Sequence, residues 1–161
     1  MKKILNIKEA LEVSKNIRKN NKTIVICGGC FDILHIGHIR FLEEAKKNGD
    51  FLFVLLENDR SVKKLKGKKR PINYQIERAE ILSAIIFVDY VILLDEMKTN
   101  SDYDKLIFAL NPNKIAVTKN DPQEIHNIRQ AKQINASVVS VISRIKNKST
   151  TKLTELIYKN F

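Results

Sequence analysis

Short apolar segments alternate with helical patterns along the chain, and this alternation constrains the fold more than any other feature. Segments rich in branched and aromatic residues predict buried strands at 23–27, 51–56, 90–94, 114–117 and 137–141. Amphipathic patterns predict helices at 6–20, 37–47, 73–86, 103–110, 122–134 and 150–158. Strands that alternate with helices of this length imply right-handed crossovers. The chain is therefore predicted to be an α/β protein with a five-stranded parallel sheet and helices on both faces.

The length of 161 residues fits a single domain, with the 6–20 helix appended to its core. No apolar run approaches the roughly 18 residues that a transmembrane helix needs, and the first residues lack the apolar stretch of a signal peptide. Two cysteines cannot build a disulfide framework, which is typical of a reducing compartment. A cytoplasmic protein without a membrane segment is therefore expected.

The charge balance favours anionic partners. The chain has 29 lysines and arginines against 18 acidic residues, which gives a formal charge of +11. Nucleotides, phosphorylated small molecules and nucleic acids all suit such an excess. Only 7% of the residues are aromatic and none is tryptophan, so no RNA-binding pattern with stacking aromatic residues is visible. A small phosphorylated ligand therefore ranks above nucleic acid.

The segment 27–38, directly after the first predicted strand, concentrates the reactive residue types. It reads Cys27-Gly28-Gly29-Cys30-Phe31-Asp32-Ile33-Leu34-His35-Ile36-Gly37-His38 and holds both cysteines and two of the three histidines. In open parallel sheets, ligands bind outside the carboxyl ends of the strands, where the strand order reverses. The segment therefore lies where a ligand is expected.

Three kinds of chemistry compete for this segment. A redox role for Cys27 and Cys30 would need a helix N-terminus against a thiol, but the next helix is predicted to begin several residues later. A zinc site with His35 and His38 would have four residues between its ligand pairs, where a dozen or so are usual. Phosphate binding is favoured, because glycines and a helix N-terminus offer backbone donors and both histidines lie on one helix face. A purely structural role for the histidines is the remaining alternative.

The stretch 29–38 resembles the signature of the cytidylyltransferase-like nucleotidyltransferases. The resemblance implies a Rossmann-like sheet and an enzyme that joins a nucleoside monophosphate from ATP or CTP to a phosphorylated small-molecule acceptor, with release of pyrophosphate. It implies catalytic roles for His35 and His38, which would stabilise charge on the α-phosphate. The residues implied to line the nucleotide here are Gly28, Gly29, Cys30, Phe31 and Gly37. Mg²⁺ is expected to arrive with the nucleotide, without protein side chains as assigned ligands.

The stretch 58–73 resembles one branch of the family, the adenylyltransferase domain that makes ADP-heptose from D-glycero-β-D-manno-heptose 1-phosphate. It contains the segment 63–70, in which six of eight residues are basic; part of it is read as a solvated loop. By this resemblance, Lys63 and Lys66 are the catalytic lysines that hold phosphates.

Two further basic residues have weaker support as ligands of the substrate phosphate. They are Lys64, within the basic segment, and Arg78, on the helix after it. For Arg78 an ion pair with an acid such as Asp59 is an equal alternative.

The segment before the last predicted helix supplies a third match. Ser149, Thr150 and Thr151 alone are typical of a helix N-cap. They also resemble the family's C-terminal Ser-Thr-Thr motif, which implies that they hold the triphosphate. Arg144 matches an upstream arginine that contacts the nucleotide in related glycerol-3-phosphate cytidylyltransferases.

One loop departs from the family. Relatives have glycines, an aspartate and an aromatic residue where this chain has Thr118-Lys119-Asn120-Asp121-Pro122, so only Asp121 stays a nucleotide-binding candidate. Base and acceptor therefore remain open, with glycerol 3-phosphate and CTP, or flavin mononucleotide and ATP, as alternatives. A non-catalytic basic module that binds nucleotides or RNA is the alternative of another class. Relatives in this group are often homodimers.

Overall fold

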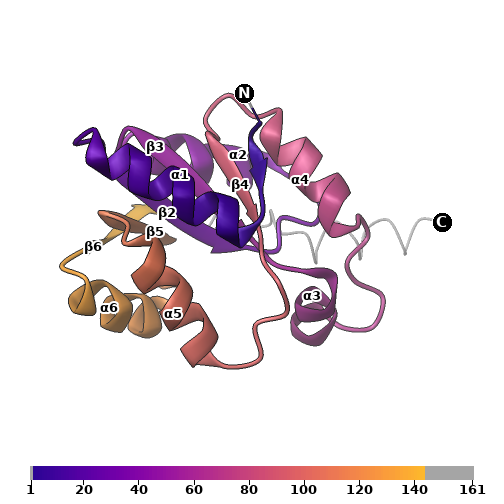
Figure 1. Ribbon diagram of the computed structural model, residues 1–161. Helices are drawn as coiled ribbons and strands as arrows, with labels where there is room; N and C mark the ends of the chain where they lie inside the picture. The colour runs from indigo at the N-terminus through magenta and orange to yellow at the C-terminus, as the bar shows by residue number, and fades with distance from the viewer. Residues whose placement is uncertain (1, 144–161) are drawn as a thin grey trace.

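The computed structural model describes residues 2–143, and these build a sheet with helices on both faces (Figure 1). Every pair of neighbouring strands is parallel, and the strand order is β1-β4-β3-β2-β5-β6. The strands are β1 (Ile4–Leu5), β2 (Ile24–Gly29), β3 (Phe51–Leu56), β4 (Tyr90–Leu93), β5 (Lys114–Thr118) and β6 (Ser137–Ile142). The predicted α/β class with a parallel sheet is confirmed.

The predicted count of five strands is one short, because the described residues form a six-stranded sheet. The additional strand β1 has two residues and pairs with β4, with Ile4 opposite Val91 and Leu5 opposite Ile92. So short a segment carries no detectable periodicity. Its strand character comes from the pairing with β4 and from the burial of Leu5, which is 4% exposed.

Helices cover the sheet on both sides. They are α1 (Ile7–Lys19), α2 (Ile36–Lys46), α3 (Asp59–Lys66), α4 (Gln75–Ser83), α5 (Asn100–Leu110) and α6 (Glu124–Gln133). All except α3 were expected from helical periodicity, with ends that differ by a few residues. The predicted helix at 150–158 lies outside the described residues.

The helix α3 corrects the expectation of a basic loop over its residues. Asn58 is its N-cap residue, and the side chain of Asn58 accepts a hydrogen bond of 2.8 Å from the backbone N–H of Ser61. Val62 is fully buried and fixes the helix to the body of the protein. A cap and one apolar anchor are enough here, although the lysines mask the pattern in the sequence.

Side chains of β2 alternate between two core clusters. Ile24 and Ile26 pack with residues of α1, α5 and α6 on one face of the sheet. Val25 and Cys27 pack with residues of α2 and α4 on the other face. In Figure 1, α1 crosses the front of the sheet and α2 lies behind it. Burial of both faces explains why the central strands are continuous apolar runs.

The order of the strands reverses beside β2. The chain passes from β2 to its neighbour β3 on one side, and later returns as β5 on the other side of β2. The carboxyl ends of β2 and β5 are therefore the switch point of the sheet, where ligands of such folds bind. Among residues 2–143, no helix is both long enough and apolar enough to span a membrane.

Candidate active site

The loop of residues 30–35, called here the β2–α2 loop, connects the end of β2 to the start of α2 at the switch point. Gly29, the last residue of β2, is opposite Leu56 of β3. The backbone N–H of Glu57 donates a hydrogen bond of 3.1 Å to the carbonyl of Gly29 and extends this pairing by one residue. The loop therefore starts from a fixed point on the sheet.

His35 and His38 come together at the N-terminus of α2. Their rings stack with centroids 3.9 Å apart and planes 24° apart. His35 is the N-cap residue, and its Nδ1 accepts a hydrogen bond of 3.1 Å from the backbone N–H of Gly37. The Nδ1 of His38 accepts one of 3.4 Å from the backbone N–H of His35. A ring nitrogen that accepts carries no proton, so each neutral imidazole has its proton on Nε2.

The electrostatics of His38 favour the neutral ring. Burial, together with a smaller effect of the neighbouring His35, lowers the pKa of His38 to about 4. The ring of Phe31, whose centroid lies 5.3 Å from that of His38, contributes to the burial of the His38 ring. At neutral pH, His38 is therefore a hydrogen-bond donor through Nε2, and a bound phosphate would raise its pKa again.

Gly29 and Phe31 shape the β2–α2 loop. Phe31 has a positive φ of 44° and a side chain that is only 6% exposed. A Cβ atom on Gly29 would lie 2.9 Å from Cε2 of Phe31, a contact that real Cβ atoms do not make. Glycine is therefore required at 29 for packing, whereas Gly28 is exposed and its nearest neighbour would be at 3.9 Å.

Asp32 ties the β2–α2 loop to the segment that follows α3, a role that the sequence did not suggest. Its carboxylate accepts hydrogen bonds from the backbone N–H groups of Ile72 and Asn73, at 2.9 and 3.0 Å, and from the Arg70 guanidinium. Burial raises the pKa of Asp32, but these donors outweigh it and hold the pKa below its ordinary value. Asp32 is thus a charged anchor, 2% exposed.

Arg78 holds three backbone segments from a buried position on α4. Its guanidinium donates hydrogen bonds to the carbonyls of Cys30, Glu57 and Asn73, at 2.5, 2.8 and 3.0 Å. It also forms an ion pair of 2.8 Å with Asp59. Of the two alternatives that the sequence left open, the structure contains the pairing with Asp59. Arg78 thus positions the backbone around the site from its buried place on α4.

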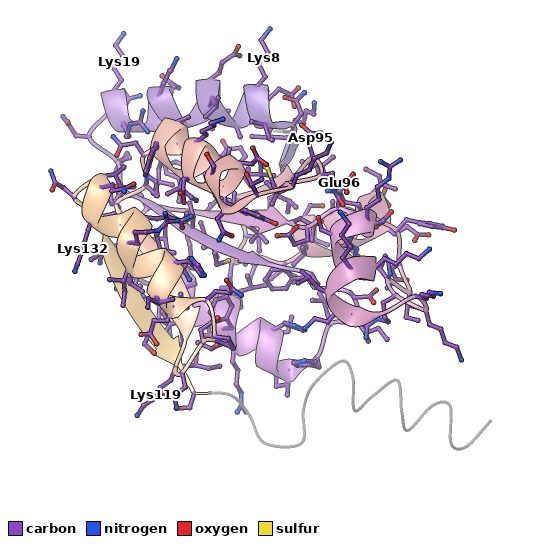
Figure 2. All side chains as sticks on the ribbon, turned by 90° about the horizontal axis from the view of Figure 1, so that it is seen from below. Lys8, Lys19, Asp95, Glu96, Lys119 and Lys132 are labelled. Atoms are coloured by element: carbon purple, nitrogen blue, oxygen red, sulfur yellow. The ribbon has the colours of Figure 1, made fainter. Side chains whose placement is uncertain are left out.

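The basic residues of α3 point to two sides of the helix. Arg60 and Lys64, one turn apart, pair with Glu96 at 3.2 and 2.7 Å; Glu96 lies beside this helix (Figure 2). Lys63 and Lys66, three residues apart, share another side and are exposed. Lys64 is therefore engaged with the protein. The phosphate roles of Lys63, Lys64 and Lys66 stay predictions.

The cysteines have the environment of structural thiols. Burial raises the pKa of Cys27 to about 12, because its side chain lies in the core of the sheet. Burial also raises the pKa of Cys30, although the nearby charge of Lys66 lowers it in part. Redox exchange and zinc binding both need thiolates, which these surroundings disfavour. The geometry therefore favours phosphate chemistry for this segment.

Asp121 acts locally in the loop of residues 119–123, called here the β5–α6 loop. Its carboxylate accepts hydrogen bonds from the Thr118 hydroxyl at 3.3 Å and from the backbone N–H of Gln123 at 2.8 Å. Asn120 adopts a positive φ of 59° within the same turn. These contacts give Asp121 a role in the turn; its nucleotide-binding role stays a prediction. Arg144, Ser149, Thr150 and Thr151 lie outside the described residues.

Comparisons with known proteins agree with this architecture. The model of the family described as cytidylyltransferase-like matches residues 26–156. The bifunctional protein HldE of Campylobacter fetus is 52% identical over 95 residues, which cover 59% of this chain and 20% of that protein. HldE of Nitratiruptor is 39% identical over 154 residues, 94% of this chain and 31% of its own length. The chain thus spans less than a third of these curated relatives.

Solved structures show the same fold. A lipopolysaccharide core biosynthesis protein from Thermoplasma volcanium superposes with a TM-score of 0.61 and 29% identity, over 80% of this chain and 99% of that one. A pantoate–β-alanine ligase from Francisella tularensis gives a TM-score of 0.66 at 19% identity, over 97% of this chain and 77% of that one. At 19% identity the second match speaks for the fold alone. The Rossmann-like prediction is confirmed.

Proposed function

The chain belongs to the cytidylyltransferase-like family of nucleotidyltransferases, and from this premise we propose that it transfers adenylate from ATP to a sugar 1-phosphate. D-glycero-β-D-manno-heptose 1-phosphate is the first candidate acceptor. The observation that carries the proposal is the stacked pair His35 and His38 at the N-terminus of α2. The HldE relatives, which match over nearly the whole chain, support the choice of ATP and of the acceptor.

The reaction requires an in-line displacement at the α-phosphorus. An oxygen of the acceptor phosphate forms the new bond, the bond from the α-phosphorus to the bridging oxygen breaks, and pyrophosphate leaves with that electron pair. Charge develops on the non-bridging oxygens of the α-phosphate. The Nε2–H groups of His35 and His38 would donate to these oxygens, and the N-terminal dipole of α2 adds to the attraction. No protein nucleophile is needed.

The remaining phosphates need positive charge and donors. In this proposal Lys63 and Lys66 hold phosphates of either reactant from the exposed side of α3. Ser149, Thr150 and Thr151 hold the β- and γ-phosphates, and Arg144 contacts the nucleotide. These roles rest on the family motifs.

The donor set fits Mg²⁺ that arrives on the nucleotide. The site offers imidazoles and lysines, and residues 2–143 contain no group of three or more His, Cys, Asp or Glu side chains arranged to hold a metal. Mg²⁺ readily keeps water and phosphate oxygens as its ligands. When bound, it would neutralise charge on the leaving pyrophosphate.

The sequence of the β5–α6 loop leaves two other substrate pairs as alternatives. It lacks the glycines and the aromatic residue of relatives, so CTP with glycerol 3-phosphate, or ATP with flavin mononucleotide, is the alternative reaction. A basic module that binds a nucleotide or RNA without turnover is the alternative of another class. Polyanion binding would weaken steeply with ionic strength, whereas turnover demands a defined acceptor.

Pyrophosphate release tests the proposal. ATP and CTP are each combined with heptose 1-phosphate, glycerol 3-phosphate and flavin mononucleotide in the presence of Mg²⁺. The expected result is release with ATP and heptose 1-phosphate and little release in the other combinations. Release of pyrophosphate only with CTP would show that the nucleotide is CTP and not ATP. No release in any combination would contradict the proposed reaction.

A further inference from the structure

Glu57 is a buried carboxylate whose hydrogen bonding is incomplete. It follows directly after β3 and is 9% exposed. Its Oε1 accepts a hydrogen bond of 2.8 Å from the hydroxyl of Tyr103 on α5. Its Oε2 is covered and has no hydrogen-bond partner among residues 2–143. Most buried side-chain oxygens are satisfied, so such an atom calls for an explanation.

We propose that Glu57, oriented by Tyr103, forms a subsite that accepts a hydrogen bond from a hydroxyl group of the acceptor. The inference rests on the proposed function, because it assigns the non-phosphate part of the same acceptor. It concerns recognition, since the carboxylate receives a hydrogen bond and takes no part in bond exchange.

The position of Glu57 places it at the active site. Its backbone N–H donates to the carbonyl of Gly29 at 3.1 Å, and its carbonyl accepts from Arg78 at 2.8 Å. Its charge also raises the pKa of the Cys30 thiol. Glu57 therefore lies against the β2–α2 loop, which leads to the histidine pair.

The surroundings of the carboxyl group favour a donor from outside. Burial raises the pKa of Glu57, and the hydroxyls of Tyr103 and Ser61 lower it only in part. An added hydroxyl that donates to Oε2 would stabilise the carboxylate and remove the penalty of its unsatisfied oxygen. The Tyr103 hydroxyl fixes the carboxyl group through Oε1. Oε2 is covered, so a ligand hydroxyl reaches it only after a neighbouring side chain moves aside, and the Ser61 hydroxyl, which already interacts with this carboxyl group, is the protein donor that it would displace.

The charge of Glu57 limits the class of ligand. A phosphate would be repelled by a carboxylate and cannot donate a hydrogen bond when fully ionised. The cations of Lys66 and Arg78 already act on this region, so a further cation from the ligand is not required. A sugar or polyol hydroxyl donates without adding charge. The acceptor would thus present its phosphate to the histidines and lysines and a hydroxyl to Glu57.

A ligand–variant cycle tests the subsite. Initial rates of pyrophosphate release are measured with saturating Mg-ATP for heptose 1-phosphate and for its singly deoxygenated analogues. The variants are Glu57→Gln, which keeps the shape and an oxygen for Tyr103, and Tyr103→Phe, which keeps the ring. Glu44→Gln is the matched control, because Glu44 lies on the exposed side of α2 and pairs with Lys47.

We expect one deoxygenated analogue to raise the KM of the parent protein about tenfold, as for other lost polar contacts. Glu57→Gln should raise the KM for heptose 1-phosphate by a similar factor, and that analogue should then cause no further loss. Tyr103→Phe should show a smaller change in the same direction. The KM for ATP should stay within about twofold in both variants.

Several outcomes would overturn the assignment. In one such outcome, Glu57→Gln raises the KM for every deoxygenated analogue by the same factor as for heptose 1-phosphate. In another, Glu57→Gln lowers the thermal stability and leaves the KM unchanged. Either result would make Glu57 a structural contact of α5. Better use of phosphoethanolamine than of glycerol 3-phosphate would assign the subsite to a cation. If the parent protein turns over no acceptor, the proposed function fails and this inference fails with it. Turnover without coupling between Glu57 and any hydroxyl refutes the subsite alone.

Discussion

The β2–α2 loop and the β5–α6 loop lie on neighbouring strands at the switch point, yet they are built differently. Residues 30–35 are fixed by distant groups, since Asp32 binds backbone N–H groups of 72 and 73, and Arg78 binds the carbonyl of Cys30. The turn at Asp121 is closed mainly by its own neighbours Thr118 and Gln123. Long-range contacts over-determine the first loop, whereas the second depends on local chemistry.

This difference agrees with the tasks that the two loops have in the proposed reaction. Stabilisation of a transition state needs donors held in place before the reaction, because reorganisation would cost free energy. A loop that recognises a base or an acceptor can change without disturbing the chemistry. The departure from the family pattern falls in the second loop.

The largest effect is expected from Arg78→Met. The change leaves Asp59 and three carbonyls without their donor in a place where the Arg78 side chain is 0% exposed. Each buried carbonyl left without a donor costs about 1–3 kcal/mol, so the free energy of unfolding should fall by about 3–5 kcal/mol. Urea denaturation measures the loss. Arg60→Met is the control, because Arg60 is 81% exposed and its loss should cost less than about 1 kcal/mol. Equal values for the two variants would contradict the distinction.

His38→Ala removes one of the two Nε2–H donors. Loss of one donor of this kind lowers kcat by about 10²–10³-fold, or about 3–4 kcal/mol of transition-state stabilisation. Pyrophosphate release at saturating substrates is the measurement. The control is His126→Ala on α6, a histidine outside the residues assigned to the site, which should turn over at the parental rate. A His38→Ala variant as active as its parent would refute the catalytic role.

Acid should lower the free energy of unfolding because His38 is buried as a neutral ring. The pKa of His38 is about 4 in the folded chain, below the value of about 6.5 for an unfolded histidine. The unfolded chain therefore binds a proton in this interval that the folded chain does not, so stability falls as the pH drops from about 6.5 to 4. The loss approaches roughly 3 kcal/mol at the lower end. Denaturation curves of the parent and of His38→Gln across this range should diverge, and parallel curves would disprove the linkage.

A matched pair of variants, Lys66→Met and Lys64→Met, distinguishes the roles of the two sides of α3. Lys66→Met should lower kcat/KM about tenfold, because a charge-assisted contact to phosphate is lost. Lys64→Met should change it by less than about twofold, because Lys64 pairs with Glu96 at 2.7 Å. Steady-state kinetics with varied ATP and acceptor distinguish them. A larger effect at Lys64 would reverse the assignment of the faces.

The smallest effect is expected from Asp121→Asn in the β5–α6 loop. The amide can still accept one hydrogen bond, so the free energy of unfolding should fall by about 0.5–1 kcal/mol. Asp32→Asn in the β2–α2 loop should cost about 2–3 kcal/mol, because a buried charge with several donors is lost. Thermal unfolding of both variants gives the comparison. Similar losses would show that the two loops are equally constrained.

Much of the molecule could be predicted from local patterns. The continuous apolar runs predicted the central strands, because a strand buried on both faces has no polar side. The glycines and the histidines before a helix pattern predict a ligand site at the end of β2, and this site stays a prediction. The prediction missed β1 and α3, since a two-residue strand has no period and an eight-residue helix with only two apolar side chains resembles a charged loop in the sequence.

The sequence by itself determined the parallel α/β fold and the place of the histidine pair, because periodicity and strand ends are local properties. Only the tertiary structure decided what Asp32, Glu57 and Arg78 do. Most of their partners lie about 20 to 50 positions away in the chain, as in the hydrogen bonds from Arg78 to Glu57 and to Cys30. Contacts over such separations depend on how the elements pack, so their physical cause lies in the assembled sheet.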